Sequence, residues 1–313
     1  MCDYGISAIF ALAINVVIYF LKQLFMKRLL FFFVALCALQ HAQATERRVV
    51  TASELAAFFQ STTYVVVTND NIILDALLSN AAQRLWTVTP HRVADVSEFD
   101  RLKTDSTNSF LMVTRVVESR DRLRRPYLHL TLLMGNPNAA TSFDAMPEVA
   151  SIPFATVSAD NETSTTVMLP AMVLFVQQHA ENSKDNAFAS RLLVSFQQRL
   201  QVYNQDMGQL RGKTIYINRS DVDSQSEILR QEARQGNVFR FVDENEIARV
   251  VNSREENAAV AFCVTPQGAV RGAFGYKMVM GVDGALYYYY PETNPRNFLF
   301  RRNDFDMIMR SAR

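Results

Sequence analysis

Two kinds of hydrophobic spacing alternate along the chain in a fixed order. Tyr64-Val65-Val66-Val67 is typical of a short buried strand. Residues 72–86 have helical spacing, which predicts one apolar face made of Ile73, Leu74, Leu77, Leu78, Ala81, Ala82 and Leu85. A strand over 87–94, a short helix opening at Asp95 and a strand over 108–117 follow. The order is therefore strand, helix, strand, helix, strand.

The same order of elements returns about 150 residues later. Strands are predicted over 213–217, 238–242 and 257–264, with a helix over 224–235 and a helix start at 243–246. Around the two short helices the match is residue by residue, because Arg92, Asp95, Glu98 and Phe99 correspond to Arg240, Asp243, Glu246 and Ile247. This pattern indicates an internal duplication.

Each half then continues into a predicted hairpin. In the first half, segments 110–117 and 127–134 bracket a charged loop, and in the second half 259–265 and 276–282 bracket a loop that contains glycine. A further strand over 286–290 follows an Asp283-Gly284 turn. The repeated unit is therefore predicted to be β-α-β-α-β-β.

A helical pair is predicted between the two halves. An apolar segment over 167–178, with Pro170 in its first turn, and an amphipathic segment over 187–207 are joined by the polar residues 181–185. We therefore predict an α/β (α+β) fold in which residues 45–160 and 210–313 form two related units and residues 161–209 connect them. We expect the units to face each other about a pseudo-two-fold axis.

The amino terminus has the pattern of an export signal. Met26-Lys27-Arg28 precedes an apolar run over 29–39, and Ala42-Gln43-Ala44 matches the small-x-small pattern of signal peptidase. Residues 26–44 are therefore predicted to be a signal peptide. Residues 1–25 form either a first apolar helix ahead of a basic loop or, as we favour, a mis-called upstream extension. Lipidation of Cys37 is disfavoured, because Leu36 stands where a small residue is needed.

Charge and cysteine content narrow the function of the remaining body. Of 32 basic and 31 acidic residues, the removed segment holds Lys22, Lys27, Arg28 and Asp3, which leaves 29 and 30. A nearly neutral body lacks the concentrated positive charge that binds nucleic acid or anionic lipid. Cys263 is the one cysteine left after cleavage, so no intrachain disulfide can form.

The sequence gives little support to catalytic chemistry. Asp95 with Glu98, and Asp243 with Glu246, are interpreted as capping boxes of short helices rather than as paired catalytic carboxylates. His91 and His129 have no third ligand at a recognisable spacing, so no zinc site is predicted. Cys263 lies in an apolar run and is expected to be an inert buried thiol. Motifs for hydrolases, nucleotide triphosphatases and dinucleotide binding do not occur.

Two features are candidates for a partner surface. The segment with Arg115, Arg120, Arg122, Arg124 and Arg125 is locally basic, although Glu118 and Asp121 interrupt it and we favour a solvated hairpin loop as its explanation. The run Tyr287-Tyr288-Tyr289-Tyr290 is the second candidate, because a strand exposes alternate side chains and tyrosine is favoured at binding surfaces. A strand buried on both faces is the alternative.

The repeated unit resembles the amino-terminal α/β domain of the translocation protein TolB and the periplasmic domain of curli-secretion-channel lipoproteins. The chain as a whole is similar to a group of uncharacterised exported proteins of Bacteroidetes, through the phrases Trp86-Thr87-Val88-Thr89-Pro90 and 210–216 (LRGKTIY). The first resemblance rests on the order of elements alone. Since the chain lacks a lipobox and propeller repeats, what the resemblance implies is an interaction module of the cell envelope.

These observations lead to one expectation and one alternative. We expect a non-enzymatic exported protein, periplasmic or associated with the outer membrane, that scaffolds or binds another envelope protein and needs neither cofactor nor metal. The alternative is an enzyme of unfamiliar type in the cleft between the two halves, with His91, His129 or a carboxylate as its base. The oligomeric state stays open.

Overall fold

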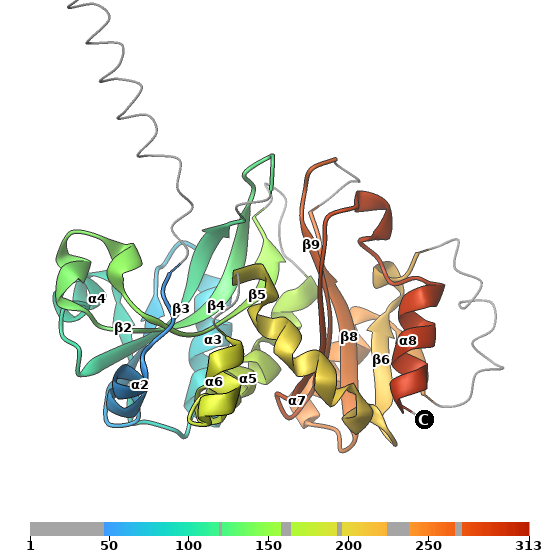
Figure 1. Cartoon of the computed structure of the whole chain (residues 1–313), viewed down its shortest axis with the longest axis horizontal. Helices are drawn as coiled ribbons and strands as arrows, with labels where there is room; N and C mark the ends of the chain where they lie inside the picture. The colour runs from blue at the N-terminus through green and yellow to red at the C-terminus, as the bar shows by residue number, and fades with distance from the viewer. Residues whose placement is uncertain are drawn as a thin grey trace, which may run out of the picture. The chain divides into compact units, whose positions relative to one another are not determined.

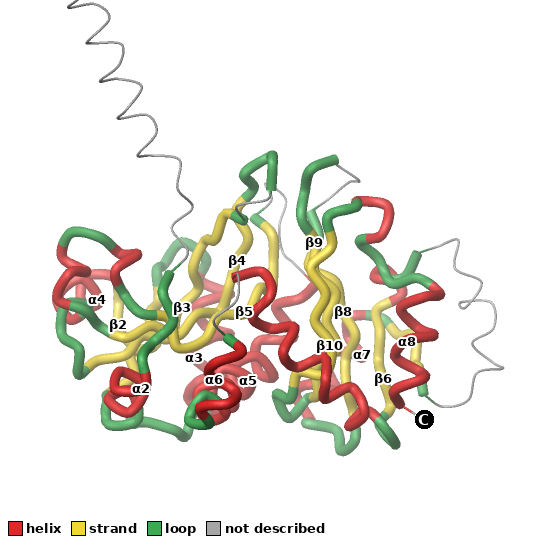
Figure 2. Tube along the Cα trace, viewed as in Figure 1, coloured by secondary structure: helices red, strands yellow, loops and turns green. Residues whose placement is uncertain are grey.

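A computed structural model of the chain describes residues 47–118, 121–157, 164–192, 196–223, 238–266 and 271–312 (Figure 1). The predicted signal peptide, the segment ahead of it and the predicted helix over 224–235 lie outside the described residues. Residues from Glu46 onward form one compact unit. Within it, Figure 2 shows two groups of strands with helices packed beside them.

The first half is built on a five-stranded mixed sheet, called here the first sheet. Its strands run in the order β2-β1-β3-β4-β5, parallel from β2 to β3 and antiparallel from β3 to β5. The elements of this half are α2 (Ala52–Phe58), β1 (Thr62–Val67), α3 (Ile72–Leu85), β2 (His91–Asp95), α4 (Val96–Leu102), β3 (Asn108–Val117), β4 (Pro126–Met134), η1 (Pro137–Ala140), η2 (Phe143–Ala145) and β5 (Glu148–Thr156).

The second half repeats this topology in a second sheet. Its order is β10-β9-β8-β6-β7, again with parallel pairing among β7, β6 and β8 and antiparallel pairing from β8 to β10. The described elements are β6 (Thr214–Asn218), η5 (Arg219–Asp221), β7 (Phe239–Val242), α7 (Glu244–Ser253), β8 (Ala258–Val264), β9 (Gly275–Gly281), β10 (Leu286–Glu292), η8 (Pro295–Asn297) and α8 (Arg302–Ala312). The α/β fold with two similar units is thus confirmed.

A repeated side-chain contact ties the duplication to individual residues. In the first half, Tyr64 of β1 pairs with Arg92 of β2, and the Arg92 guanidinium donates to the Tyr64 hydroxyl at 2.7 Å. In the second half, Tyr216 of β6 pairs with Arg240 of β7, which donates to the Tyr216 hydroxyl at 3.1 Å. Each arginine also lies over the ring of its tyrosine. The sheets can therefore be aligned position by position.

The connector consists of η3 (Ser164–Met168), α5 (Leu169–Asn182), α6 (Asn186–Arg191) and η4 (Phe196–Leu210). Its first helix matches the prediction, and Pro170 lies in the first turn. The second predicted helix is wrong as one continuous element, because it divides into the short α6 and the 3-10 helix η4. Asn204 of η4 exchanges two hydrogen bonds with the backbone of Tyr289, at 3.0 and 2.8 Å. The connector thus pairs with the edge strand β10.

One hydrophobic core joins the two halves, and it uses non-equivalent faces of the two sheets. The first sheet contributes the face of Val65 and Leu111, whereas the second contributes the face of Tyr216 and Val260. By the alignment of Tyr64 with Tyr216, the second face corresponds to the Tyr64 face of the first sheet, which forms a separate cluster with α4. The expected pseudo-two-fold arrangement is therefore wrong, because the units stack front to back.

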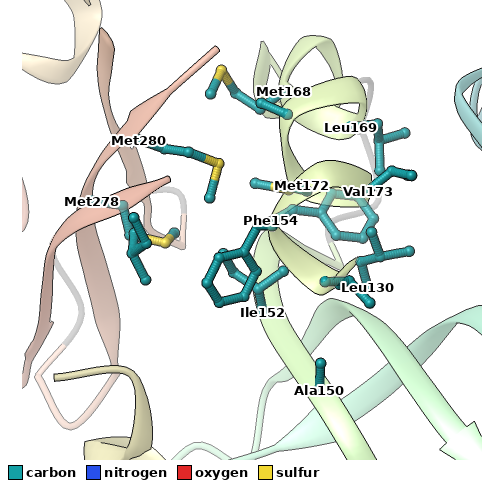
Figure 3. Close-up of a cluster of buried hydrophobic side chains, with 14 of the residues drawn as sticks. Leu130, Ala150, Ile152, Phe154, Met168, Leu169, Met172, Val173, Met278 and Met280 are labelled. Carbon is teal, nitrogen blue, oxygen red and sulfur yellow. The ribbon is translucent and has the colours of Figure 1, made fainter. Parts of the chain in front are cut away.

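The helix after the fifth strand differs between the halves accordingly. In Figure 3, Met172 of α5 lies with Ile152 and Phe154 of β5 opposite Met278 and Met280 of β9. Because α5 is covered by both halves, it is buried on most of its surface. The helix α8 follows β10 and packs Phe305 and Ile308 on the opposite face of the second sheet, while Arg302 and Arg310 are exposed and Asp304 pairs with the buried Lys277.

Candidate functional site

An open cleft of about 520 Å³ lies between the two halves, on the α3 side of the first sheet. In α/β sheets this position, beyond the carboxyl ends of the parallel strands, is where ligands usually bind. The first half supplies most of the lining, with Thr166 of η3 and Glu244 of α7 closing it from the other side. From the first half come Thr68, Asp70, Asn71, Ile73, Leu74, Asp75, Leu77, Val113, Arg115, Leu128, Phe154, Thr156 and Val157.

Local hydrogen bonds fix the wall of the cleft that α3 forms. Asn71 is the N-cap and its side chain accepts from the Leu74 N–H at 3.0 Å. The Asp75 carboxylate accepts from the N–H groups of Thr68 and Asn69, at 3.3 and 2.8 Å. Asn69 adopts a left-handed conformation, with φ 63°, which asparagine tolerates better than most residues. The loop and the first turns of α3 therefore hold each other in place.

This wall exposes large apolar side chains. Ile73 and Leu77 line the cleft and are 59% and 42% exposed, while Ile72 beside them is 77% exposed. Val157 on the other side of the cleft is 40% exposed. The predicted apolar face, which included Ile73 and Leu77, is thus buried in part, since the core contacts of α3 are made by Leu74, Leu78, Ala81 and Ala82. A solvated apolar patch of this kind is typical of an interaction site.

The number of apolar residues in the predicted helix over 72–86 already indicates this patch, although the prediction placed them on one face. Ile72, Ile73, Leu74, Leu77 and Leu78 together span a wider arc than one buried helix face requires. The additional apolar residues in the first turn of the helix, Ile72 and Ile73, lie outside the core.

The charged residues of the cleft are predominantly acidic. Of the described lining residues, Asp70 and Asp75 come from the first half and Glu244 from the second, against Arg115 as the single basic residue. Among the described residues, neither Asp70 nor Glu244 forms an ion pair, and both are exposed. Their charge is therefore available to a ligand at the mouth of the cleft.

The tyrosine run occupies β10 at the edge of the second sheet. Tyr287, Tyr288 and Tyr289 are buried, and Tyr290 alone of the four is exposed, at 42%. A bulge between Leu286 and Tyr288 interrupts the alternation, and η4 and α8 cover the two sides of the strand. The structure therefore corrects the expectation of two outward-facing tyrosines and supports the alternative of a strand buried on both faces.

The basic residues of the β3–β4 hairpin form the second candidate surface, which is separate from the tyrosine run in the sequence. Arg122 and Arg124 are exposed and Arg125 is half-buried, whereas Arg120 lies outside the described residues. The Arg122 backbone N–H donates to the Gly272 carbonyl at 3.0 Å, so this loop contacts the second half. Its two acidic residues are buried, with Glu118 accepting from the Tyr276 hydroxyl and the Asp121 carboxylate 3.3 Å from the Tyr127 hydroxyl.

His129 lines a separate, small polar cavity between the halves. Its Nδ1 contacts the Ser151 hydroxyl at 3.1 Å, and Glu148, Arg199 and His179 line the same cavity. Glu148 and Arg199 form an ion pair at 3.1 Å. Sequence reasoning missed His179, which lies within the apolar helix α5 and contacts the Tyr203 hydroxyl at 2.9 Å.

The chemistry of this cavity is limited by its size and burial. Its volume is about 20 Å³, which is room for one water molecule but not for an organic substrate. Burial lowers the pKa of His129 to about 3 and that of His179 to about 4, with nearby Arg47 and Arg199 as further causes. Bases this weak are poorly matched to proton abstraction near neutral pH.

The remaining candidates of the sequence lie in structural positions. His91 begins the edge strand β2. Cys263 is buried in β8, its S–H donates to the Asp221 carbonyl at 3.7 Å, and burial raises the pKa of its thiol. The Asp95 and Asp243 side chains cap α4 and α7 as predicted. Glu98 and Glu246 instead pair with Arg92 and Arg249, at 3.3 and 2.8 Å.

Neither a metal site nor a membrane-spanning helix is found in the described part of the chain. No group of three or more histidine, cysteine, aspartate or glutamate residues there has the arrangement of metal ligands. None of its helices combines the length and the apolar character that crossing a bilayer requires.

Comparison with known proteins adds no relative. No protein-family model matches the chain, and no curated protein or solved structure matches it significantly. The class that fold and site define is a duplicated α/β protein with an open, partly apolar cleft between its halves.

Proposed function

We propose that this chain is a non-enzymatic, exported interaction module of the cell envelope, periplasmic or associated with the outer membrane. The signal-peptide pattern of residues 26–44 supports the location. The observation that carries the binding role is the solvent-exposed apolar wall of the cleft, formed by Ile73 and Leu77.

The cleft also argues for binding rather than for turnover. Its walls combine apolar side chains with exposed carboxylates, and the two histidines with displaced pKa values line the small, separate cavity. The alternative of an enzyme between the halves is favoured by one observation, the gathering of His129, His179, Glu148 and Arg199 around that cavity. Its volume of about 20 Å³ makes this the weaker proposal.

Site-specific photo-crosslinking in cells of the native host tests the binding role. A photoreactive residue at Ile73 or Leu77 is expected to capture one and the same exported protein, identified by mass spectrometry. The matched control is Asp100 on α4, which is exposed and does not line the cleft. Equal capture of the same protein from Asp100 contradicts a binding role of the cleft. No capture from either cleft position, together with turnover of a small molecule by the purified chain, argues for the enzyme instead.

A further inference from the structure

We propose that the cleft binds an extended polypeptide segment in which apolar side chains flank a lysine or arginine. This inference rests on the function proposed above and adds the chemistry of the partner. Three observations carry it, namely the apolar lining, the sign of the charge at the mouth and the extent of the patch beyond the cleft.

The apolar part of the cleft lies where the core face of the first sheet reaches solvent beside α3, with Val113 and Leu128 half-buried and Phe154 buried. Val113, Leu128 and Phe154 come from three adjacent strands, β3, β4 and β5, and Ile73 and Leu77 stand beside them on α3. Elsewhere the same face is covered by α5 and the second half. A ligand that fills this part of the cleft with apolar side chains continues the packing of the core, which gains roughly 25 cal/mol for each Å² removed from water.

The charge at the mouth selects a basic partner. Asp70 and Glu244 approach from opposite halves, and neither forms an ion pair among the described residues. Asp75 adds a third carboxylate, partly engaged by the loop N–H groups of Thr68 and Asn69. Among the described residues that line the cleft, Arg115 is the only basic one, so these residues together carry an excess of two negative charges. Charge complementarity of this kind governs partner choice more than affinity.

The extent of the apolar surface favours a polypeptide over a small amine. Ile72 is 77% exposed, lies next to Ile73 and does not line the cleft, so the patch continues past its mouth. A molecule that fits inside the cleft leaves Ile72 in water, whereas an extended segment crosses both. A strand also places alternate side chains on opposite sides, which suits a cleft with an apolar floor and a charged rim.

Fluorescence anisotropy with the chain as isolated from the host tests the inference. Four probes are compared: a decapeptide with leucines around two lysines, the same peptide with glutamates for lysines, the lysine peptide with serines for leucines, and phenethylamine as a competitor. The variants are Glu244→Lys and Glu244→Gln, with Glu256→Lys as the control, because Glu256 is exposed and lies outside the cleft. Glu244→Gln guards against a loss of folding from a lysine at the start of α7.

The leucine–lysine peptide is expected to bind saturably, and the glutamate and serine peptides at least about tenfold more weakly. Glu244→Lys is expected to weaken the lysine peptide by about threefold to tenfold and to strengthen the glutamate peptide, with Glu244→Gln in between, as for a pair of exposed charges. The control Glu256→Lys is expected to change neither, and added salt is expected to reduce the difference.

Three results overturn the inference. If the lysine and glutamate peptides bind equally well, the partner is not selected for basic residues. If the serine peptide binds as well as the leucine peptide, the partner is not selected for apolar residues. Full displacement by phenethylamine at the concentration at which the peptide itself competes assigns the cleft to small amines. If crosslinking from Leu77 still captures an exported protein in any of these cases, the interaction module stands and the proposed partner chemistry fails. If both experiments fail, both proposals fall.

Discussion

Whether a single side chain in this protein is buried depends mainly on where the second half covers the first. Leu74 and Leu78 are buried while Ile73 and Leu77, on the same helix, are solvent-exposed. The sequence pattern could identify the helix, but it could not show that its first turn lies beside a cleft. The same limit applies to Tyr287, Tyr288 and Tyr289, whose burial depends on η4, which is far from them in sequence, and on α8, which was not predicted.

Buried histidines make the stability of the chain depend on pH in the acid range. The pKa of His129 falls to about 3 and that of His179 to about 4, so the unfolded chain takes up protons below about pH 6.5 while the folded chain does not. Stability from these groups is therefore complete above about pH 6.5 and is lost as the pH falls toward 4. Two such groups give a slope of about 2.7 kcal/mol per pH unit near pH 5.

Removal of one histidine is expected to halve this contribution. For His129→Asn, urea unfolding followed between pH 7 and 4.5 is expected to show a slope smaller by about 1.4 kcal/mol per pH unit. His179→Gln is expected to do the same, and the double variant to lose both contributions. Because the slope is the readout, a constant loss of stability from the substitution does not obscure it. Slopes equal to that of the wild type contradict the prediction.

Asp221, at the end of η5, has the opposite effect. Burial raises its pKa to about 7, so the folded chain holds a proton that the unfolded chain has already released above about pH 4. Stability is therefore greatest below pH 4 and is lost as the pH rises toward 7. Asp221→Asn is expected to be stabilising by on the order of 4 kcal/mol at pH 8 relative to its effect at pH 4.

Thermal unfolding of Asp221→Asn at the two pH values measures this difference. Asp100→Asn, at an exposed position of α4, is the matched control and is expected to show no such dependence. A variant whose advantage shrinks as the pH rises contradicts the assignment of a raised pKa to Asp221.

At the scale of elements, the sequence predicted the order of strands and helices wherever local spacing decides it. The strand over 108–117 and the caps at Asp95 and Asp243 are confirmed. The helix α2 and the strand β5 were not predicted. In β5 every residue is buried, so there is no alternation to read, and Pro153 lies at the irregular pairing with β4. The difference between α5 and α8 likewise depends on neighbours that spacing does not reveal.

Gln177 of the connector helix α5 binds the first half through its side-chain amide. Its Nε2 donates to the Leu85 carbonyl at 2.9 Å and its Oε1 accepts from the Thr87 N–H at 2.7 Å, so α5 holds the chain where it leaves α3. Gln177→Leu keeps the apolar contacts and removes both bonds, which is expected to cost about 1–3 kcal/mol.

The measurement for Gln177→Leu is the urea midpoint, with Glu181→Gln as the control on the exposed side of the same helix. Hydrogen exchange of the Thr87 amide separates this role from general packing, since its protection is expected to fall more than that of the strand amides of β3. Unchanged protection at Thr87 contradicts the role given to Gln177.

For the whole molecule, the shared core predicts that the two halves unfold together. The Tyr127 hydroxyl of β4 donates to the Phe274 carbonyl at 2.8 Å and accepts from the Phe274 N–H at 3.1 Å, which adds a buried polar link across the halves. Two natural probes report the halves separately, Trp86 by fluorescence in the first and Cys263 by alkylation in the second.

Both probes are expected to give one urea midpoint in the wild type. Tyr127→Phe removes the hydroxyl that pairs with the Phe274 backbone groups. It is expected to lower the free energy of unfolding by about 2–3 kcal/mol and thereby to lower the urea midpoint. The two probes are expected to coincide in the variant as well, since the apolar core is unchanged. Separate midpoints for Trp86 and Cys263 in the wild type contradict a single cooperative unit.

The front-to-back stacking has a consequence for how many units such a chain can hold. The interface joins two different faces, so it has a direction and does not close into a symmetric pair. Another unit could therefore be added in the same direction. The face of the second sheet that corresponds to the docking face of the first is the one on which α8 packs Phe305 and Ile308. α8 therefore covers, on the second sheet, the face that docks in the first, as capping repeats cover end faces in solenoid proteins. Removal of this helix is expected to expose the apolar side chains that Phe305 and Ile308 cover, and such a surface favours head-to-tail association.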